Sequence, residues 1–168
     1  MNDSQKGSYI QGNMEVMLQQ FGWAIKIPKD PGQRDDLTIS YKENDIRISY
    51  DIQIKVGNFT DNQNGTRRIK FRIRSHGPNY EDKYVLKDYI GDVHYFGIFV
   101  DNWWEHNRGK GFLFPIEEIY DRYNGEFASM LYCPLNGVRV DTMYAIDYDI
   151  DIILDKYVQD NPHLIKSK

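Results

Sequence analysis

The sequence predicts an α/β domain in which helices flank a mixed central β-sheet. Three observations lead to this fold class: helical spacing of apolar residues near the N-terminus, strict alternation of apolar and polar residues over 46–56, and a nearly all-apolar run over 95–100. A continuous apolar run is typical of a strand that is buried on both faces, so we expect residues 95–100 in the middle of the sheet. Strands interleaved with helices in this order indicate an α/β fold.

The first helix is expected over residues 13–21. Its apolar side chains recur at the spacing i, i+3, i+4, i+7 and share one face, which carries Met14, Met17, Leu18 and Phe21. Asn13 is a suitable N-cap residue, and Gly22 a suitable end of the helix. Residues 1–12 are polar, and we expect them to be frayed.

Seven strands and three further helices are expected along the rest of the chain. The strands are predicted at residues 23–28, 37–41, 46–56, 68–74, 95–100, 111–116 and 144–151. The helices are predicted at residues 81–92, 117–122 and 152–158. Because no repeat and no interdomain linker is evident, the sequence predicts a single domain over 1–168, with a core of about 13–122 and a C-terminal strand and helix extension of about 123–168.

Composition excludes several classes of protein. The 168 residues hold 21 Lys and Arg against 25 Asp and Glu, a net charge of −4, which argues against a strongly basic nucleic-acid coat protein. The single cysteine excludes an internal disulfide framework and a cysteine-rich zinc site. The apolar runs are too short to span a membrane, and the N-terminus lacks the apolar core of a signal peptide. We therefore expect a cytoplasmic protein with no membrane partner.

Positive charge is concentrated on one predicted strand. Within residues 68–74, alternate positions share one face, and that face carries Arg68, Lys70, Arg72 and Arg74. A row of this kind can contact the phosphates of a nucleic acid, since backbone electrostatics dominate such binding. The alternative is an edge strand whose charges discourage aggregation.

Hard oxygen ligands for a divalent metal are available between two neighbouring strands. A loop with Asp30, Asp35 and Asp36 leads into the strand at 37–41, and the next strand ends in Gln53-Ile54-Lys55. Carboxylate and amide oxygens suit Mg²⁺, and a lysine beside them can orient a water molecule or stabilise a phosphoryl transition state. On spacing alone, a solvated sheet face with cross-strand polar pairs explains the same residues.

The order of these elements resembles the PD-(D/E)XK, or restriction-endonuclease-like, nucleases, in particular the compact resolvase-like and Mrr-like bacterial members. The match runs over roughly residues 13–122. It comprises a first helix with a glutamate, Phe21-Gly22-Trp23 entering a strand, the acidic loop, Gln53-Ile54-Lys55, and a helix followed by the apolar strand that ends at Asp101. The resemblance implies a restriction-endonuclease-like mixed sheet.

The resemblance also implies roles for individual residues. In that family an aspartate binds metal, the D/E/Q-x-K pair supplies a second ligand and a lysine, and a glutamate of the first helix often assists. Transferred to this chain, Asp36 and Gln53 would bind Mg²⁺, Lys55 would orient the attacking water, and Glu15 would assist. An alternative register makes Asp51 the metal-binding acid and places Arg72-Ile73-Arg74 in the second motif, which would leave the site inactive.

The function implied is Mg²⁺-dependent hydrolysis of phosphodiester bonds in bacterial or mobile-element DNA processing or defence. DNA or RNA would be the partner, and a homodimer is a further expectation. Two alternatives stay open. One is a catalytically inactive nuclease-like module that binds a protein partner, favoured by Gln53 in place of an acid. The other is an anti-defence protein that binds a bacterial defence enzyme.

Overall fold

The computed structural model describes residues 3–28, 36–43, 46–61, 67–76, 82–84, 86–101, 109–123 and 130–154. The helices are α1 (Asp3–Gln20), α2 (Leu86–Tyr89), α3 (Ile116–Tyr123) and the 3-10 helix η1 (Ala145–Tyr148). The strands are β1 (Ala24–Lys26), β2 (Leu37–Glu43), β3 (Ile46–Asp61), β4 (Arg67–Arg72), β5 (Ser75–His76), β6 (Asp82–Tyr84), β7 (Tyr95–Val100), β8 (Lys110–Pro115) and β9 (Met130–Pro134).

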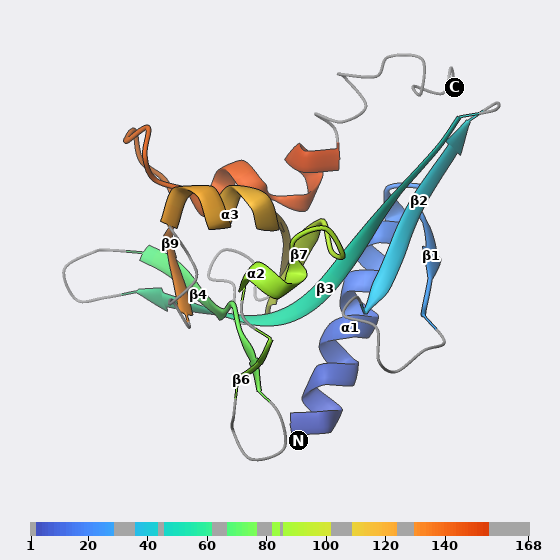
Figure 1. Cartoon of the computed structure of the whole chain (residues 1–168), viewed down its shortest axis with the longest axis horizontal. Helices are drawn as coiled ribbons and strands as arrows, with labels where there is room; N and C mark the ends of the chain where they lie inside the picture. The colour runs from blue at the N-terminus through green and yellow to red at the C-terminus, as the bar shows by residue number, and fades with distance from the viewer. Residues whose placement is uncertain are drawn as a thin grey trace.

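A mixed seven-stranded sheet is built around the long strand β3. The strands follow the order β1-β2-β3-β4-β9, and β7 and β8 branch from β3. Strands β2 and β4 run antiparallel to β3, whereas β7 runs parallel to it. In Figure 1, β3 crosses the molecule from its hairpin with β2 to its pairing with β4. This mixed sheet confirms the predicted fold class.

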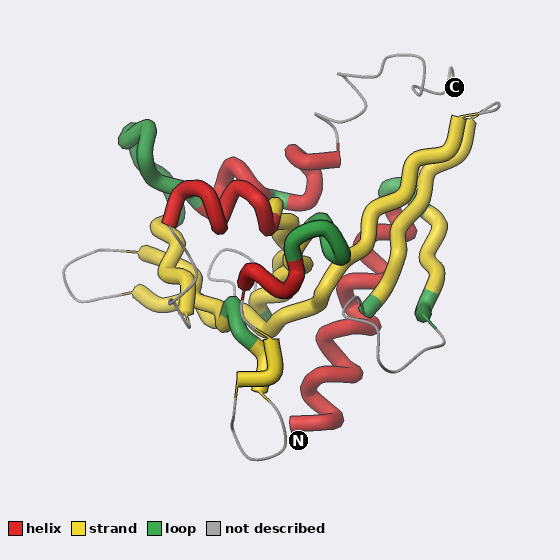
Figure 2. The backbone as a smooth tube through the Cα atoms, viewed as in Figure 1, coloured by secondary structure: helices red, strands yellow, loops and turns green. Residues whose placement is uncertain are grey.

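Helices cover both faces of the sheet (Figure 2). On one face, Ile10, Met14 and Leu18 of α1 are buried in a core with side chains of β2 and β3. On the other face, Ile116 and Ile119 of α3 are buried with side chains of β4, β7, β8 and η1. Burial of apolar surface in these two cores fixes the sheet between α1 and α3.

Strand β7 is buried on both faces, as its apolar run predicted. Phe96, Ile98 and Val100 belong to the α3-side core, and Phe99 between them belongs to the α1-side core. The alternation that the sequence predicts for residues 46–56 is also present, since Ile52 is fully buried while Asp51 and Gln53 beside it are only partly buried.

Two predicted boundaries were wrong because tertiary packing extends the elements. Helix α1 begins at Asp3 rather than at Asn13, since Ile10 adds a further turn to the buried stripe of Met14 and Leu18. Strand β3 continues to Asp61, beyond the predicted end at residue 56, because its last five residues pair with β4. Both extensions carry polar side chains on their solvent-facing sides, so the apolar pattern of the sequence does not reveal them.

Two further predictions failed towards the C-terminal half. Residues 81–92 were predicted as one helix, but β6 occupies 82–84 and α2 only 86–89. Residues 144–151 were predicted as a strand, but η1 forms there, followed by helix over 150–154. Strand β9, which the sequence analysis did not predict, completes the sheet by pairing with β4.

Candidate functional site

A gap in strand pairing marks the middle of β3. Ile52 pairs with β2 on one edge and with β7 on the other, and Gly57 pairs likewise with β4 and β7. Because β7 occupies one edge throughout, β2 and β4 share the opposite edge. Residues 53–56 lie between the ends of β2 and β4, and no described strand pairs with them on that edge. We call this stretch the β3 notch.

Asp36 closes one end of the β3 notch. Its backbone N–H donates to the carbonyl of Ile52 over 2.8 Å, and its Oδ2 accepts a hydrogen bond of 2.7 Å from the N–H of Ile54. The carboxylate therefore takes the place of the missing strand partner at Ile54. A short, charged acceptor immediately before β2 is needed for this arrangement, which holds Asp36 in a fixed orientation.

Lys55 is the residue of the β3 notch that follows Ile54, and its side chain is largely buried. Its Nζ donates to the carbonyl of Arg74 over 3.2 Å and lies 5.6 Å from the ring centroid of Tyr89 and 5.7 Å from that of Phe96. Burial lowers the pKa of Lys55 from 10.5 to about 8, against the opposing charge of Asp36, and the positive charge of Arg72 lowers it further. The amine therefore titrates at about pH 8.

This lowered pKa predicts how stability depends on pH. Between about pH 8 and 10.5 the unfolded chain keeps the Lys55 proton while the folded chain releases it, so the free energy of unfolding rises with pH in that window. The expected gain is on the order of 3 kcal/mol. Urea titrations from pH 7 to 10.5 should show it in the wild type and not in Lys55→Met. Parallel curves for the two proteins would contradict the buried, shifted amine.

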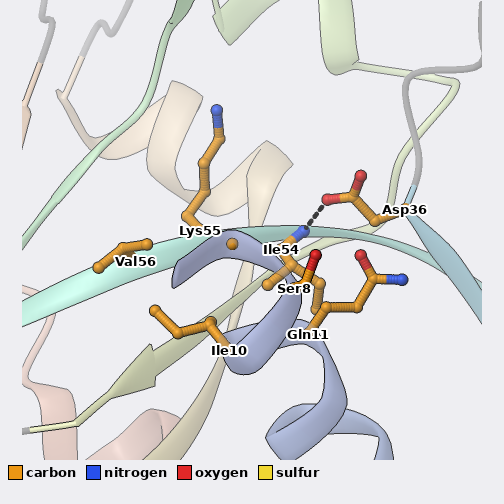
Figure 3. A pocket seen from close by; sticks show the side chains of 8 residues that line it. Ser8, Ile10, Gln11, Asp36, Ile54, Lys55 and Val56 are labelled. Carbon is orange, nitrogen blue, oxygen red and sulfur yellow. Dashed lines mark hydrogen bonds between the residues drawn. The ribbon is translucent and has the colours of Figure 1, made fainter. Parts of the chain in front are cut away.

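Asp36 and Lys55 line one cavity of about 310 Å³ at the β3 notch. Its other walls are Ile54 and Val56 of β3, and Gly7, Ser8, Ile10 and Gln11 of α1. In Figure 3 the amide of Gln11 points towards Asp36, while Lys55 extends away from α1. Ser8 and Gln11 were not among the predicted site residues because residues 1–12 were expected to be frayed. The recurrence of apolar residues from Ile10 to Leu18 is the signal that identifies this helical turn.

Gln53 and Glu15, the other predicted site residues, lie near the cavity but do not line it. Gln53 is half-buried and follows Ile52 at the last rung of the β2–β3 ladder, on the same strand face as Lys55. Glu15 lies one helical turn beyond Gln11 on α1, and its Oε1 is buried and has no hydrogen-bond partner among the described residues. A buried carboxylate oxygen without a partner is expensive, so this atom is suited to a cation or a bound water.

Asp51, the acid of the alternative register, lies elsewhere on β3. Its Oδ1 accepts a hydrogen bond of 2.7 Å from Thr38, and its N–H donates to Nδ1 of His94 over 2.9 Å. It does not line the cavity shared by Asp36 and Lys55. Asp30 and Asp35, the other acids of the loop, lie outside the described residues.

The basic row of β4 lies next to the notch. Ile69 and Phe71 point into the α3-side core, so Arg68, Lys70 and Arg72 share the opposite face of the strand. Arg72 is close enough to Lys55 for its charge to affect the pKa of that amine. Arg74 lies beyond the end of β4 and holds Lys55 through its carbonyl. The row therefore ends where the β3 notch begins.

Comparison with solved structures identifies a nuclease of the same fold. The chain superposes on a bacterial homing endonuclease, I-Ssp6803I, with a TM-score of 0.56 at 13% sequence identity, covering 96% of this chain and 98% of that one. The two chains share a nuclease-like fold. Scans of the sequence against protein-family models and against curated proteins found no match.

Neither a cluster of metal-ligating side chains nor a membrane-spanning helix occurs among the described residues. Within them, no three His, Cys, Asp or Glu side chains gather closely enough to form a metal site by themselves. Over the same ranges, none of the helices has the length and apolar character required to cross a membrane.

Proposed function

We propose that this chain is a metal-dependent nuclease that hydrolyses phosphodiester bonds at the β3 notch. The observation that supports it most directly is the pairing of two residues at the β3 notch: Asp36, whose carboxylate is fixed by Ile54, and Lys55, a buried amine of lowered pKa on which the charge of Asp36 acts. Perturbed titratable groups in a concave site are typical of catalytic sites. The fold shared with an endonuclease makes phosphodiester hydrolysis the reaction to test first.

The residues around the notch fit a divalent cation such as Mg²⁺. In the proposal, the carboxylate of Asp36 and the side-chain oxygen of Gln53 would hold it, and Glu15, with its unpartnered Oε1, would assist through an intervening water. All three offer the hard oxygen donors that Mg²⁺ prefers. When bound, the cation would lower the pKa of a coordinated water and neutralise charge on the scissile phosphate.

Lys55 orients the attacking water and exchanges its proton. With a pKa of about 8, the amine is charged in most molecules at pH 7 and neutral in an appreciable fraction of them. The neutral form accepts a proton from the water as it attacks phosphorus, and the charged form stabilises the negative charge that develops on the phosphoryl oxygens. The bond from phosphorus to the leaving oxygen breaks, and that oxygen takes up a proton from solvent. The rings of Tyr89 and Phe96, 5.6 and 5.7 Å from the amine, restrict its position.

Cleavage assays test this proposal directly. The purified chain should nick or linearise plasmid DNA, or cut single-stranded DNA or RNA, when Mg²⁺ is supplied, and a chelator should abolish the reaction. Mg²⁺-dependent cleavage that persists unchanged in Lys55→Ala would eliminate the proposed role of the lysine. A chain that cuts none of these substrates with Mg²⁺ or Mn²⁺ would eliminate the nuclease proposal itself.

The basic row is expected to bind the nucleic-acid backbone. Neutralising one phosphate-contacting cation, as in Lys70→Gln, should lower the slope of log K against log salt concentration by about one and weaken binding to all sequences alike. Fluorescence anisotropy at several salt concentrations measures both quantities. Arg139, which is 75% exposed and pairs with Asp141, provides the matched control. Equal slopes for Lys70→Gln and the wild type would contradict a backbone contact at Lys70.

A catalytically inactive nuclease-like binding module is the second candidate. Two observations favour it: Lys55 is held by the carbonyl of Arg74, and Asp36 already accepts a hydrogen bond from the backbone of Ile54. A module of this kind would bind its partner equally well in Mg²⁺ and in chelator. Binding without cleavage, together with no measurable affinity for Mg²⁺ or Mn²⁺, would favour this candidate over the nuclease.

A further inference from the structure

The sheet has an open face at the end opposite the β2–β3 hairpin. Leu131 and Cys133 of β9 are buried in the core beneath α3, so the residue between them, Tyr132, points to the opposite face. Tyr132 pairs with Lys70, and Arg72 of the same face is exposed. We call the surface formed by Arg68, Lys70, Arg72 and Tyr132 the β4–β9 face.

Tyr132 is an exposed aromatic ring within a row of cations. Its side chain is 48% exposed, and the guanidinium of Arg68 lies 4.7 Å from the ring centroid. The Nε of Arg68 is buried and has no hydrogen-bond partner within the part of the chain that the structure describes. Over the described ranges no carboxylate forms an ion pair with Arg68, Lys70 or Arg72. Planar groups and uncompensated positive charge are therefore presented together at the surface.

We propose that the β4–β9 face binds a nucleic-acid strand with unpaired bases, with Tyr132 stacking on a base while Arg68, Lys70 and Arg72 contact the flanking phosphates. This inference rests on the proposed function, because the row leads to the β3 notch. It adds a substrate class: single-stranded nucleic acid.

The chemistry of the face distinguishes a single strand from a duplex. An intact duplex presents phosphates and base edges, whereas the flat faces of its bases are stacked on one another and cannot meet a protein ring. An unpaired base exposes a flat face, and stacking on an aromatic side chain is tolerant of sequence. The cationic row alone could bind either a single strand or a duplex. The exposed ring of Tyr132 favours a strand with unpaired bases.

Binding measurements in the presence of a chelator test this assignment without cleavage. Fluorescence anisotropy compares a labelled single-stranded oligonucleotide with a blunt duplex of the same sequence, using the full chain. We expect the wild type to prefer the single strand. Tyr132→Ala should weaken single-strand binding by about tenfold or more and leave duplex binding unchanged. Tyr132→Phe should bind as the wild type does. Tyr9→Ala removes a ring that is 46% exposed on α1 and should have no effect.

Four other outcomes overturn the assignment. Equal losses for both substrates, an unaffected Tyr132→Ala, or a preference for the duplex would show that the ring does not stack on a base. A dimer of the wild type that Tyr132→Ala dissociates would assign the face to a second copy of the chain. Single-strand binding without Mg²⁺-dependent cleavage would instead contradict the proposed nuclease and leave this face assigned.

Discussion

Replacing Lys55 by methionine is expected to lower kcat/KM for nucleic-acid cleavage by a factor of about 100 to 10,000. The substitution removes the group that exchanges a proton with the attacking water. It should leave the fold intact, because a thioether packs well between the rings of Tyr89 and Phe96 and removes a buried charge. Initial rates on one substrate, with circular dichroism as a check on folding, measure the effect.

The matched control for Lys55 is Lys26, an exposed residue of β1. Lys26→Met removes a charge of the same kind from the surface and should cleave at the wild-type rate. If Lys55→Met and Lys26→Met lost activity equally, the loss would come from the change in net charge or from the preparation of the proteins. If neither lost activity, Lys55 would be a buried structural amine with no part in the reaction.

Replacing Asp36 by asparagine should weaken divalent-cation binding and reduce cleavage by a factor of at least about 100. The amide oxygen of asparagine still accepts a hydrogen bond from the N–H of Ile54, so the β3 notch keeps its shape while the charge disappears. Because the charge of Asp36 supports the protonated amine, its loss should also move the pKa of Lys55 further below about 8. Calorimetric titration with Mn²⁺ and NMR titration of the lysine measure these two effects.

Asp121→Asn, at an exposed position of α3, is the control for Asp36. It should bind Mn²⁺ and cleave as the wild type does. Wild-type affinity for Mn²⁺ in Asp36→Asn would exclude this carboxylate as a ligand. Asp51 would then be the acid to replace next, with loss of its hydrogen bond from Thr38 as the structural readout.

Much of the fold could be predicted from the sequence because hydrophobic periodicity records burial. The all-apolar run of β7 and the alternation of β3 are read directly from side chains that face the two cores. The ends of elements were harder to predict. Strand β3 continues past Gly57 only because β4 pairs with it, and α1 begins early only because Ile10 packs on the sheet. No pattern in the neighbouring sequence predicts either contact.

The candidate site was predictable in part for the same reason. Asp36 and Lys55 could be named from the spacing of an acidic loop and a Gln-x-Lys strand end, and the structure brings both to one cavity. The wall formed by Ser8 and Gln11 comes from a segment more than 20 residues distant in sequence from Asp36, and only tertiary packing places it there. Strand β9 was missed because its five residues are too few to show a period, and with it the exposed ring of Tyr132.

A Mn²⁺ soak of crystals of the chain, read by anomalous difference density, tests the central claim most directly. The proposed nuclease predicts a peak at the β3 notch, within coordination distance of the Asp36 carboxylate and the side-chain oxygen of Gln53, and its loss in Asp36→Asn. A notch without anomalous density, in a crystal whose Asp36 accepts only the hydrogen bond from Ile54, would contradict it.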